Sequence, residues 1–394
     1  MSARHARESN YFQVLEQVGG NWQIRNVTLE DMLLRADSPS LFFVFVPANI
    51  FRSSRCESLR RNLFHRYAIP TLLWNDLYIR ANGFSGCEDI YVKGSAKAHN
   101  TWIRFLVKKH IPDLCCSKQA YDWDEMTFFT TWNPPNRNAV FCFDTPSALQ
   151  NKVQEALSSV DDNRWSFDPY SIHAVLIDAV LDVYNASVWS ARDLIRNIEK
   201  NRTSSSDPKP NYPQIHDIAR HAIHSSETLN VAIGTLNSLL RQHNEFLEER
   251  PIMAKGATTI CIHKCTTRTL RLQLQMFQNL LLRSQSNRER LQNEITLAFN
   301  TVAQHDSRVA VDIGQAAKMD SAAMKTIAIL TLAFLPATFV ATIFGMSSFD
   351  YSDGAWSLSR KFWIYWTISG PLTVITVVFW LYFQQRYFKK IRQS

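Results

Sequence analysis

The stretch FLPATFVATIFGMSSFD, Phe334 to Asp350, decides how this chain is organised. Apart from threonine hydroxyls, it carries nothing polar before Gly345, where the apolar run gives way to Gly-Met-Ser. Thr331, Thr338 and Thr342 are spaced so that their hydroxyls share one face of a helix. Such a face suits the lining of a pore, although threonines in an apolar helix also bond to the carbonyls of their own helix.

Two uncharged apolar runs near the C-terminus predict two membrane-spanning helices. Thr326–Met346 and Phe362–Phe383 are about 21 and 22 residues long, enough for a helix to cross a hydrocarbon core of about 30 Å. Soluble helices of that length almost always carry a charged face, which these runs lack. We therefore expect spans at 326–346 and 362–383, joined by a short external loop at 347–361.

The sequences of the two ends predict that both termini are cytosolic. The N-terminal stretch MSARHARESNYF has no apolar core followed by small residues, as a secretory signal would have. The tail at 384–394 is basic, and such flanks stay in the cytosol; its charges are Arg386, Lys389, Lys390 and Arg392. Seven cysteines without a paired spacing fit a reducing compartment. We expect a multi-pass membrane protein and favour the plasma membrane over an organelle.

Residues 1–165 alternate β-like runs with turns and predict a cytosolic α/β domain. The runs are apolar, aromatic and β-branched: Leu41–Asn49, Thr101–Lys109, Met126–Trp132 and Ala139–Asp144. No glycine-rich phosphate loop, HExxH motif or nucleophile elbow occurs there, so no motif indicates an enzyme. The formal net charge of +8 is scattered and no nucleic-acid-reading motif accompanies it, so we expect no nucleic-acid partner.

Residues 166–325 predict a cytosolic helical stalk, which makes the whole chain an α+β membrane protein. Apolar residues at helical spacing predict helices at Pro169–Lys200 and Gln214–Glu249, and a third that runs from Thr258 without proline to Pro336. The third helix carries a coiled-coil-like seam that predicts packing between subunits: Leu291, Ile295, Ala298, Val302, His305, Val309, Ile313, Ala316, Asp320 and Met324. A helical bundle within one chain would give the same periodicity.

Two groups of histidine and cysteine resemble metal ligands but lack the geometry of a site. Cys261 and Cys265 share a helix face from which His263 points away. His221 and His224 could share a face, but no third ligand is visible beside them, which favours a packed or solvated pair. We therefore predict no inner-sphere metal site.

A stalk helix leads into MKTIAILTLAFLPATFVATIFGM, a short loop and a second span at the extreme C-terminus. This arrangement resembles the CorA superfamily of divalent-cation channels, which includes the ZntB zinc transporters. In detail it is similar to the divergent CorA-like proteins of filamentous fungi. The resemblance is clear from about Asp306 to Phe383 and weak over the N-terminal domain. It implies a homopentamer whose first spans surround a central pore, with the second spans outside.

The resemblance also implies a pore mouth at the outer end of the first span. The family signature Gly-Met-Asn matches Gly345, Met346 and Ser347, so serine replaces the asparagine that would hold a hydrated cation. A hydroxyl still accepts a hydrogen bond from a coordinated water, but it reaches less far than a carboxamide. Asp350 and Asp353 in the loop would concentrate cations, unless they only form a solvated loop.

The pore lining implied by the resemblance is a stripe along the first span. The family's proline and pore-facing threonine match Pro336 and Thr338. The full stripe comprises Met324, Ile327, Thr331, Leu335, Thr338 and Thr342, and it ends at Gly345. The expected activity is passive passage of divalent cations, Mg²⁺ first, with Zn²⁺, Co²⁺ and Ni²⁺ as further transported or regulatory ions. No covalently bound cofactor is expected, and the partners are the lipid bilayer, the other subunits and the cations.

Acidic residues of the stalk offer a second role. In the family, cytosolic divalent ions bind acidic groups between subunits and hold the channel shut, and Asp306, Asp312 and Asp320 would supply such groups here. Asp320 could instead pair with Lys318 or Lys325. Two other hypotheses for the whole protein stay open. One is a non-conducting, membrane-anchored scaffold or ion sensor, and the other is a membrane-anchored enzyme.

Overall fold

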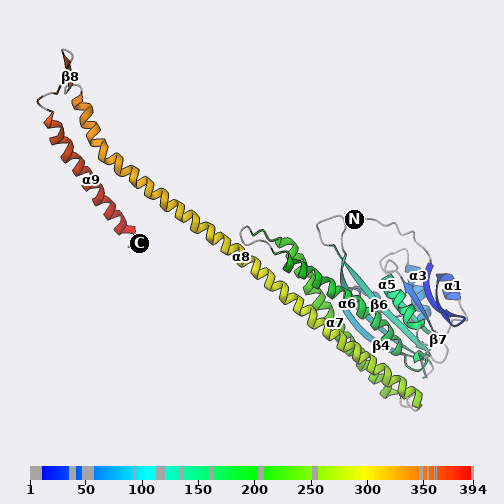
Figure 1. The fold of residues 1–394 in the computed structure, drawn as a ribbon. Coiled ribbons are helices and arrows are strands. Elements are labelled where there is room, and N and C mark those ends of the chain that lie inside the picture. The colour runs from blue at the N-terminus through cyan, green and yellow to red at the C-terminus, as the bar shows by residue number, and fades with distance from the viewer. Residues whose placement is uncertain are drawn as a thin grey trace. The chain divides into compact units, whose positions relative to one another are not determined.

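The computed structural model of the chain describes residues 11–34, 41–46, 57–92, 95–111, 120–133, 137–158, 164–202, 208–250, 256–345, 349–352, 355–358, 360 and 362–391. The chain forms two compact units, Met1–Phe299 and Asn300–Ser394. The division falls inside the stretch predicted as a stalk, and the predicted boundary at 165 stays a prediction. One helix, α8, begins in the first unit and continues into the second (Figure 1).

The described part of the first unit contains a seven-stranded mixed sheet with the order β2-β1-β3-β7-β6-β5-β4. Its strands are β1 (Tyr11–Val18), β2 (Asn21–Thr28), β3 (Leu41–Val46), β4 (Gly83–Val92), β5 (Ser95–Ile111), β6 (Ala120–Asn133) and β7 (Arg137–Phe143). β3 and β7 run parallel, and the other neighbours are antiparallel. Gly19 and Gly20, with φ of 60° and 87°, close the β1–β2 hairpin with a turn that suits the strand twist. Each of the four runs predicted as strands contains a strand, and residues 47–49 of the first run lie outside the described residues.

Helices cover both faces of this sheet. Every residue of β3 is buried, which requires cover on both sides because successive side chains point to opposite faces. One face packs against α1 (Leu29–Leu34) and α3 (Glu57–Tyr67). The other packs against α5 (Ser147–Ser158), α6 (Ser171–Lys200), α7 (Tyr212–Glu249) and the start of α8 (Ala257–Gly345). Short helical turns lie at Thr71–Trp74, Asp76–Ile79 (α4) and Arg164–Ser166.

The three long helices predicted from the sequence are confirmed. The Asn211 side chain accepts a hydrogen bond from the Gln214 amide at 3.2 Å, and a proline follows in the first turn, which is a typical helix start for α7. α8 is 89 residues long and continues through Pro336. Its first part is fastened to α6 by ion pairs, with Arg290 on Glu199 and Arg202, just after α6, on Glu294, both at 2.6 Å.

One part of the predicted intersubunit seam packs inside the chain instead. Leu291 is buried against Ile195, Ile215 and Ile218, and Ile295 packs beside them. The prediction failed there because a helix of a bundle within one chain shows the same three-and-four periodicity as a helix between chains. Further along α8, Val309 and Ile313 are 41 % and 64 % exposed on the single chain. The intersubunit role therefore remains a prediction only for this later part.

The second unit contains the rest of α8, a β-hairpin and α9. Part of the predicted loop 347–361 forms strands, because β8 (Phe349–Ser352) pairs antiparallel with β9 (Ala355–Leu358). The predicted tail is also structured over most of its length, because α9 (Trp363–Ile391) continues to Ile391. Among the described residues, three helices are long and apolar enough to cross a membrane: α6, α8 and α9. The apolar window is 56 % buried in α6 but only 11 % in α8 and 6 % in α9, where the two spans were predicted.

The first unit should lose stability in mild acid because it buries neutral histidines. Burial lowers the pKa of His221 to about 4, helped by nearby Lys108 and His110, and that of His173 to about 3. In the unfolded chain both rings take up a proton near pH 6.5, so the unfolded state binds more protons between pH 6.5 and 4 and stability falls as pH falls. His221 alone should account for about 3 kcal/mol of that loss.

Chemical denaturation of the detergent-purified protein between pH 7.5 and 4.5 measures this loss. His221→Gln should make the free energy of unfolding depend less on pH. His65→Gln, a change of an exposed ring in α3, is the control and should leave the pH dependence of the unaltered protein in place. A free energy of unfolding that is constant across this pH range in the unaltered protein contradicts the assignment.

Candidate ion pathway

The second unit packs α9 against one face of α8. Pro336 and Val340 of α8 are buried there, and Ser369 of α9 is buried opposite. The Tyr365 hydroxyl donates a hydrogen bond to the carbonyl of Ala337 at 3.3 Å. These contacts fix which side of α8 is turned toward α9 in the single chain.

The stripe predicted as pore lining lies on the opposite face of α8. At about 100° per residue, its members from Met324 to Gly345 fall within an arc of about 80°, and Val340 lies about 180° from its centre. Thr331, Thr338 and Thr342 are exposed, and Leu335 is 61 % exposed. At the N-terminal end of the stripe, Met324 lines a groove between α8 and α9 together with Trp380 and Phe383. Most of the stripe therefore has no partner in its own chain among the described residues.

The three hydroxyls on this stripe are bonded to their own helix. Thr331 donates to the Ile327 carbonyl at 2.9 Å, Thr338 to that of Leu335 at 2.9 Å and Thr342 to that of Phe339 at 2.7 Å. Each hydroxyl has one hydrogen and two lone pairs, so donating the hydrogen to the helix leaves the oxygen as an acceptor. The stripe thus presents acceptor oxygens, which can bind the water shell of a cation.

The predicted pore mouth is described only in part. Gly345 is the last residue of α8, while Met346, Ser347 and Asp353 lie outside the described residues. Asp350 lies in β8, where its backbone is paired with Ser357. Their roles at a mouth stay a prediction.

The pattern of this region matches a known family. The family described as "CorA-like Mg2+ transporter protein" matches residues 136–389, which is more than half of the chain. This chain belongs to the CorA family. The match begins at β7 and runs through α9, so it covers the stalk helices and the α8–α9 hairpin. At the level of the family, the chain is a membrane protein that transports divalent cations.

Individual relatives are more distant. "Notoamide biosynthesis cluster protein M'" of Aspergillus versicolor is 27 % identical over 383 residues, covering 87 % of this chain and 78 % of that protein. The full-length CmaX protein is similar with a TM-score of 0.48 and 12 % identity, covering 95 % of this chain and 97 % of that chain. The soluble domain of CorA from Methanocaldococcus jannaschii is similar with a TM-score of 0.45 and 10 % identity, covering 74 % and 97 %.

The acidic residues predicted from the sequence to sense ions are exposed on the single chain. Asp306, Asp312 and Asp320 are all exposed on α8. Asp320 lines the same open groove as Lys325 and Trp380. An ion pair of Asp320 with Lys318 or Lys325 stays the alternative to ion sensing by these acidic residues. Their sensing role stays a prediction.

The histidine and cysteine groups singled out in the sequence do not form sites of their own. Cys261 is exposed while His263 is buried, so the ring does point away from the cysteines as expected. His221 stacks on Tyr121 with ring centroids 4.7 Å apart, and His224 lies 3.4 Å from Glu227. These two rings therefore face different partners.

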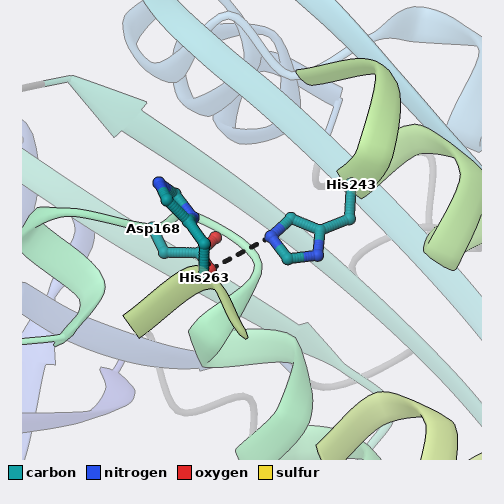
Figure 2. Close-up of side chains that lie close together, drawn as sticks. All are labelled: Asp168, His243 and His263. Atoms are coloured by element: carbon teal, nitrogen blue, oxygen red, sulfur yellow. Dashed lines mark hydrogen bonds and ion pairs between the residues drawn. The ribbon is translucent and has the colours of Figure 1, made fainter. Parts of the chain in front are cut away.

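Sequence reasoning missed the residues that His263 meets. Its ring lies beside Asp168, from the turn before α6, and His243 of α7 lies against the same carboxylate (Figure 2). A signal was present, since His243 follows Leu229, Leu236 and Leu239 in the buried three-and-four spacing of α7 and precedes buried Phe246. A titratable residue at a core position of a helix calls for a buried partner.

Proposed function

We propose that this chain assembles as a homopentamer around α8 and conducts divalent cations passively across a membrane, with Mg²⁺ as the main ion. The observation that supports this most is the stripe of α8, which is turned away from α9 and presents acceptor oxygens. A single α8–α9 hairpin cannot enclose a pore, so the stripe needs copies of itself to close one. Family membership supports the cation class of the substrate.

The proposed pathway carries a cation together with its first water shell. Mg²⁺ gives up its water reluctantly, so rings of threonine oxygens would bind the coordinated waters rather than the ion. Rings of Met324, Ile327 and Leu335 would form dry constrictions that resist ions until the helices move apart. Threonine rings would thus predominate near the outer end of the path, and apolar rings would predominate toward the cytosol.

The proposed mouth is Gly345, Met346 and Ser347, with Asp350 and Asp353 in the adjoining hairpin. Both termini would lie in the cytosol, since residues 384–394 are basic and such flanks stay inside. The spans would then be 326–346 and 362–383. Ser347 would bind hydrated ions more weakly than the asparagine of the family signature because its hydroxyl reaches less far.

Ion uptake into liposomes tests this function. Purified protein should admit Mg²⁺ down its gradient, and Ser347→Asn should raise uptake at low Mg²⁺ several-fold by extending the ring of acceptors. Ser158→Asn, at an exposed site in α5 of the first unit, is the matched control and should change nothing. If neither the unaltered protein nor Ser347→Asn admits Mg²⁺, Zn²⁺, Co²⁺ or Ni²⁺, the non-conducting scaffold is the correct function.

A further inference from the structure

Three side chains from distant parts of the sequence meet inside the first unit. Asp168 precedes α6, His243 lies near the end of α7, and His263 lies near the start of α8 (Figure 2). Their side chains are 0 %, 0 % and 6 % exposed. Such a group ties together the ends of three helices, and its members must satisfy one another because water has little access.

The ligand atoms converge on one carboxylate oxygen. Asp168 Oδ2 lies 3.1 Å from His243 Nε2 and 3.0 Å from His263 Nδ1, and all three atoms lie within 4.8 Å of one another. Two ligands that each bind one tetrahedral ion at about 2.1 Å are about 3.4 Å apart. Small rotations of the side chains therefore suffice to seat an ion between them.

The other carboxylate oxygen already has a partner. Asp168 Oδ1 accepts a hydrogen bond from the Tyr170 amide at 2.9 Å, which leaves Oδ2 for the two rings.

The contacts of His243 suit a metal ligand. The Thr267 hydroxyl donates its hydrogen to the His263 carbonyl at 2.9 Å and lies 3.4 Å from His243 Nδ1. With the His243 hydrogen on Nδ1, where the Thr267 oxygen can accept it, the lone pair of Nε2 faces Asp168 Oδ2 at 3.1 Å and can bind a metal ion.

His263 supplies the third ligand atom. Its Nδ1 is buried and has no hydrogen-bond partner among the described residues, although it lies 3.0 Å from Asp168 Oδ2. One metal ion would bind all three ligand atoms, whereas without a metal ion each neutral ring would have to donate an N–H to Asp168 Oδ2. Two imidazoles and a carboxylate suit Zn²⁺ and related transition metals, while Mg²⁺ prefers oxygen ligands.

We propose that Asp168, His243 and His263 bind one divalent transition-metal ion of the Zn²⁺ type, which links the ends of α6, α7 and α8. The site is separate from the proposed ion pathway, since all three residues belong to the first unit. Its burial favours a stabilising ion over one that exchanges freely with solvent. The Thr267 hydroxyl contacts the His243 ring and the Tyr170 amide contacts the Asp168 carboxylate. Both contacts would fix the orientation of these ligands without touching the ion.

Cobalt binding to the full-length protein in detergent tests the proposal. After chelator treatment, Co²⁺ should bind at one equivalent per chain with the strong visible absorption of a tetrahedral site, and Zn²⁺ should displace it one for one. His263→Gln should abolish the absorption, and His221→Gln, a buried ring of α7 that stacks on Tyr121, should retain it. Zn²⁺ should raise the melting temperature of the unaltered protein by several degrees, and Mg²⁺ should not.

If His263→Gln fails to fold, a second variant that places a thiolate ligand at the same position still tests the proposal. His263→Cys should bind Co²⁺ and add an intense thiolate-to-cobalt band in the near ultraviolet. Absence of tetrahedral absorption in the unaltered protein overturns the proposal in favour of a proton-linked cluster. Absorption that survives His263→Gln, or a His263→Cys spectrum without the thiolate band, places the metal elsewhere and also overturns it.

Discussion

Divalent-cation flux through liposomes should fall about a hundredfold or more when Thr338 is replaced by lysine. In the proposed pentamer the change puts five positive charges around a narrow path. Even at the dielectric of bulk water, five unit charges at about 6 Å repel a divalent ion by on the order of 5 kcal/mol. Every 1.4 kcal/mol of repulsion lowers the rate of ion passage about tenfold. Rings of lysine or arginine line pores that select anions over cations.

Thr367→Lys is the matched control for this change. Thr367 is an exposed threonine of α9 whose hydroxyl bonds to its own helix, as that of Thr338 does. A lysine there can extend its ammonium group to the nearby membrane interface. Flux should be retained in Thr367→Lys. Equal flux in Thr338→Lys and the unaltered protein, at equal incorporation into liposomes, would exclude Thr338 from the pathway.

The assembly should dissociate when Val302, Val309 and Ile313 are all replaced by glutamate. These residues follow one face of α8 in steps of seven and four, beyond the part that packs inside the chain. Burying each apolar side chain at an interface is worth about 1.5 kcal/mol or more, and five glutamates at each level would repel one another. Native mass measurement in mild detergent should change from a pentamer to a monomer.

Val311→Glu is the control for the dissociation. Val311 is 55 % exposed and lies about 180° around the helix from Val302, so it falls outside the seam. The pentamer should survive this change. A monomer in the unaltered protein, or equal dissociation by Val311→Glu and the triple variant, would show that the seam does not hold subunits together.

Much of the first unit could be predicted from periodicity, and its exceptions have physical causes. The runs that became β3, β5, β6 and β7 are dense in aromatic and β-branched residues because both sheet faces are covered. β4 escaped prediction because it is one of the two edge strands of the described sheet and GFSGCEDIYV mixes polar and apolar residues without a clean alternation. β8 and β9 were missed because each strand has only four residues.

Periodicity could not say which surface a helix meets. Leu291 and Val309 both fit the seam pattern of α8, yet Leu291 is 1 % exposed and Val309 is 41 % exposed on the single chain. The Asp168 cluster was hidden for a similar reason, since its ligands come from three segments that only the fold brings together. In contrast, the threonine stripe could be predicted from Thr331, Thr338 and Thr342 alone, because all its members lie on one helix.

Cysteine accessibility tests most directly whether the stripe of α8 lines the cation pathway. A small cationic thiol reagent that does not cross membranes would be added outside liposomes carrying Thr342→Cys or Val340→Cys. Val340 is the control because it is 3 % exposed and faces α9. We predict that the reagent modifies Thr342→Cys and blocks Mg²⁺ uptake, and that it leaves Val340→Cys unmodified and conducting. Modification of Val340→Cys with block, while Thr342→Cys stays unmodified and conducting, would contradict the account.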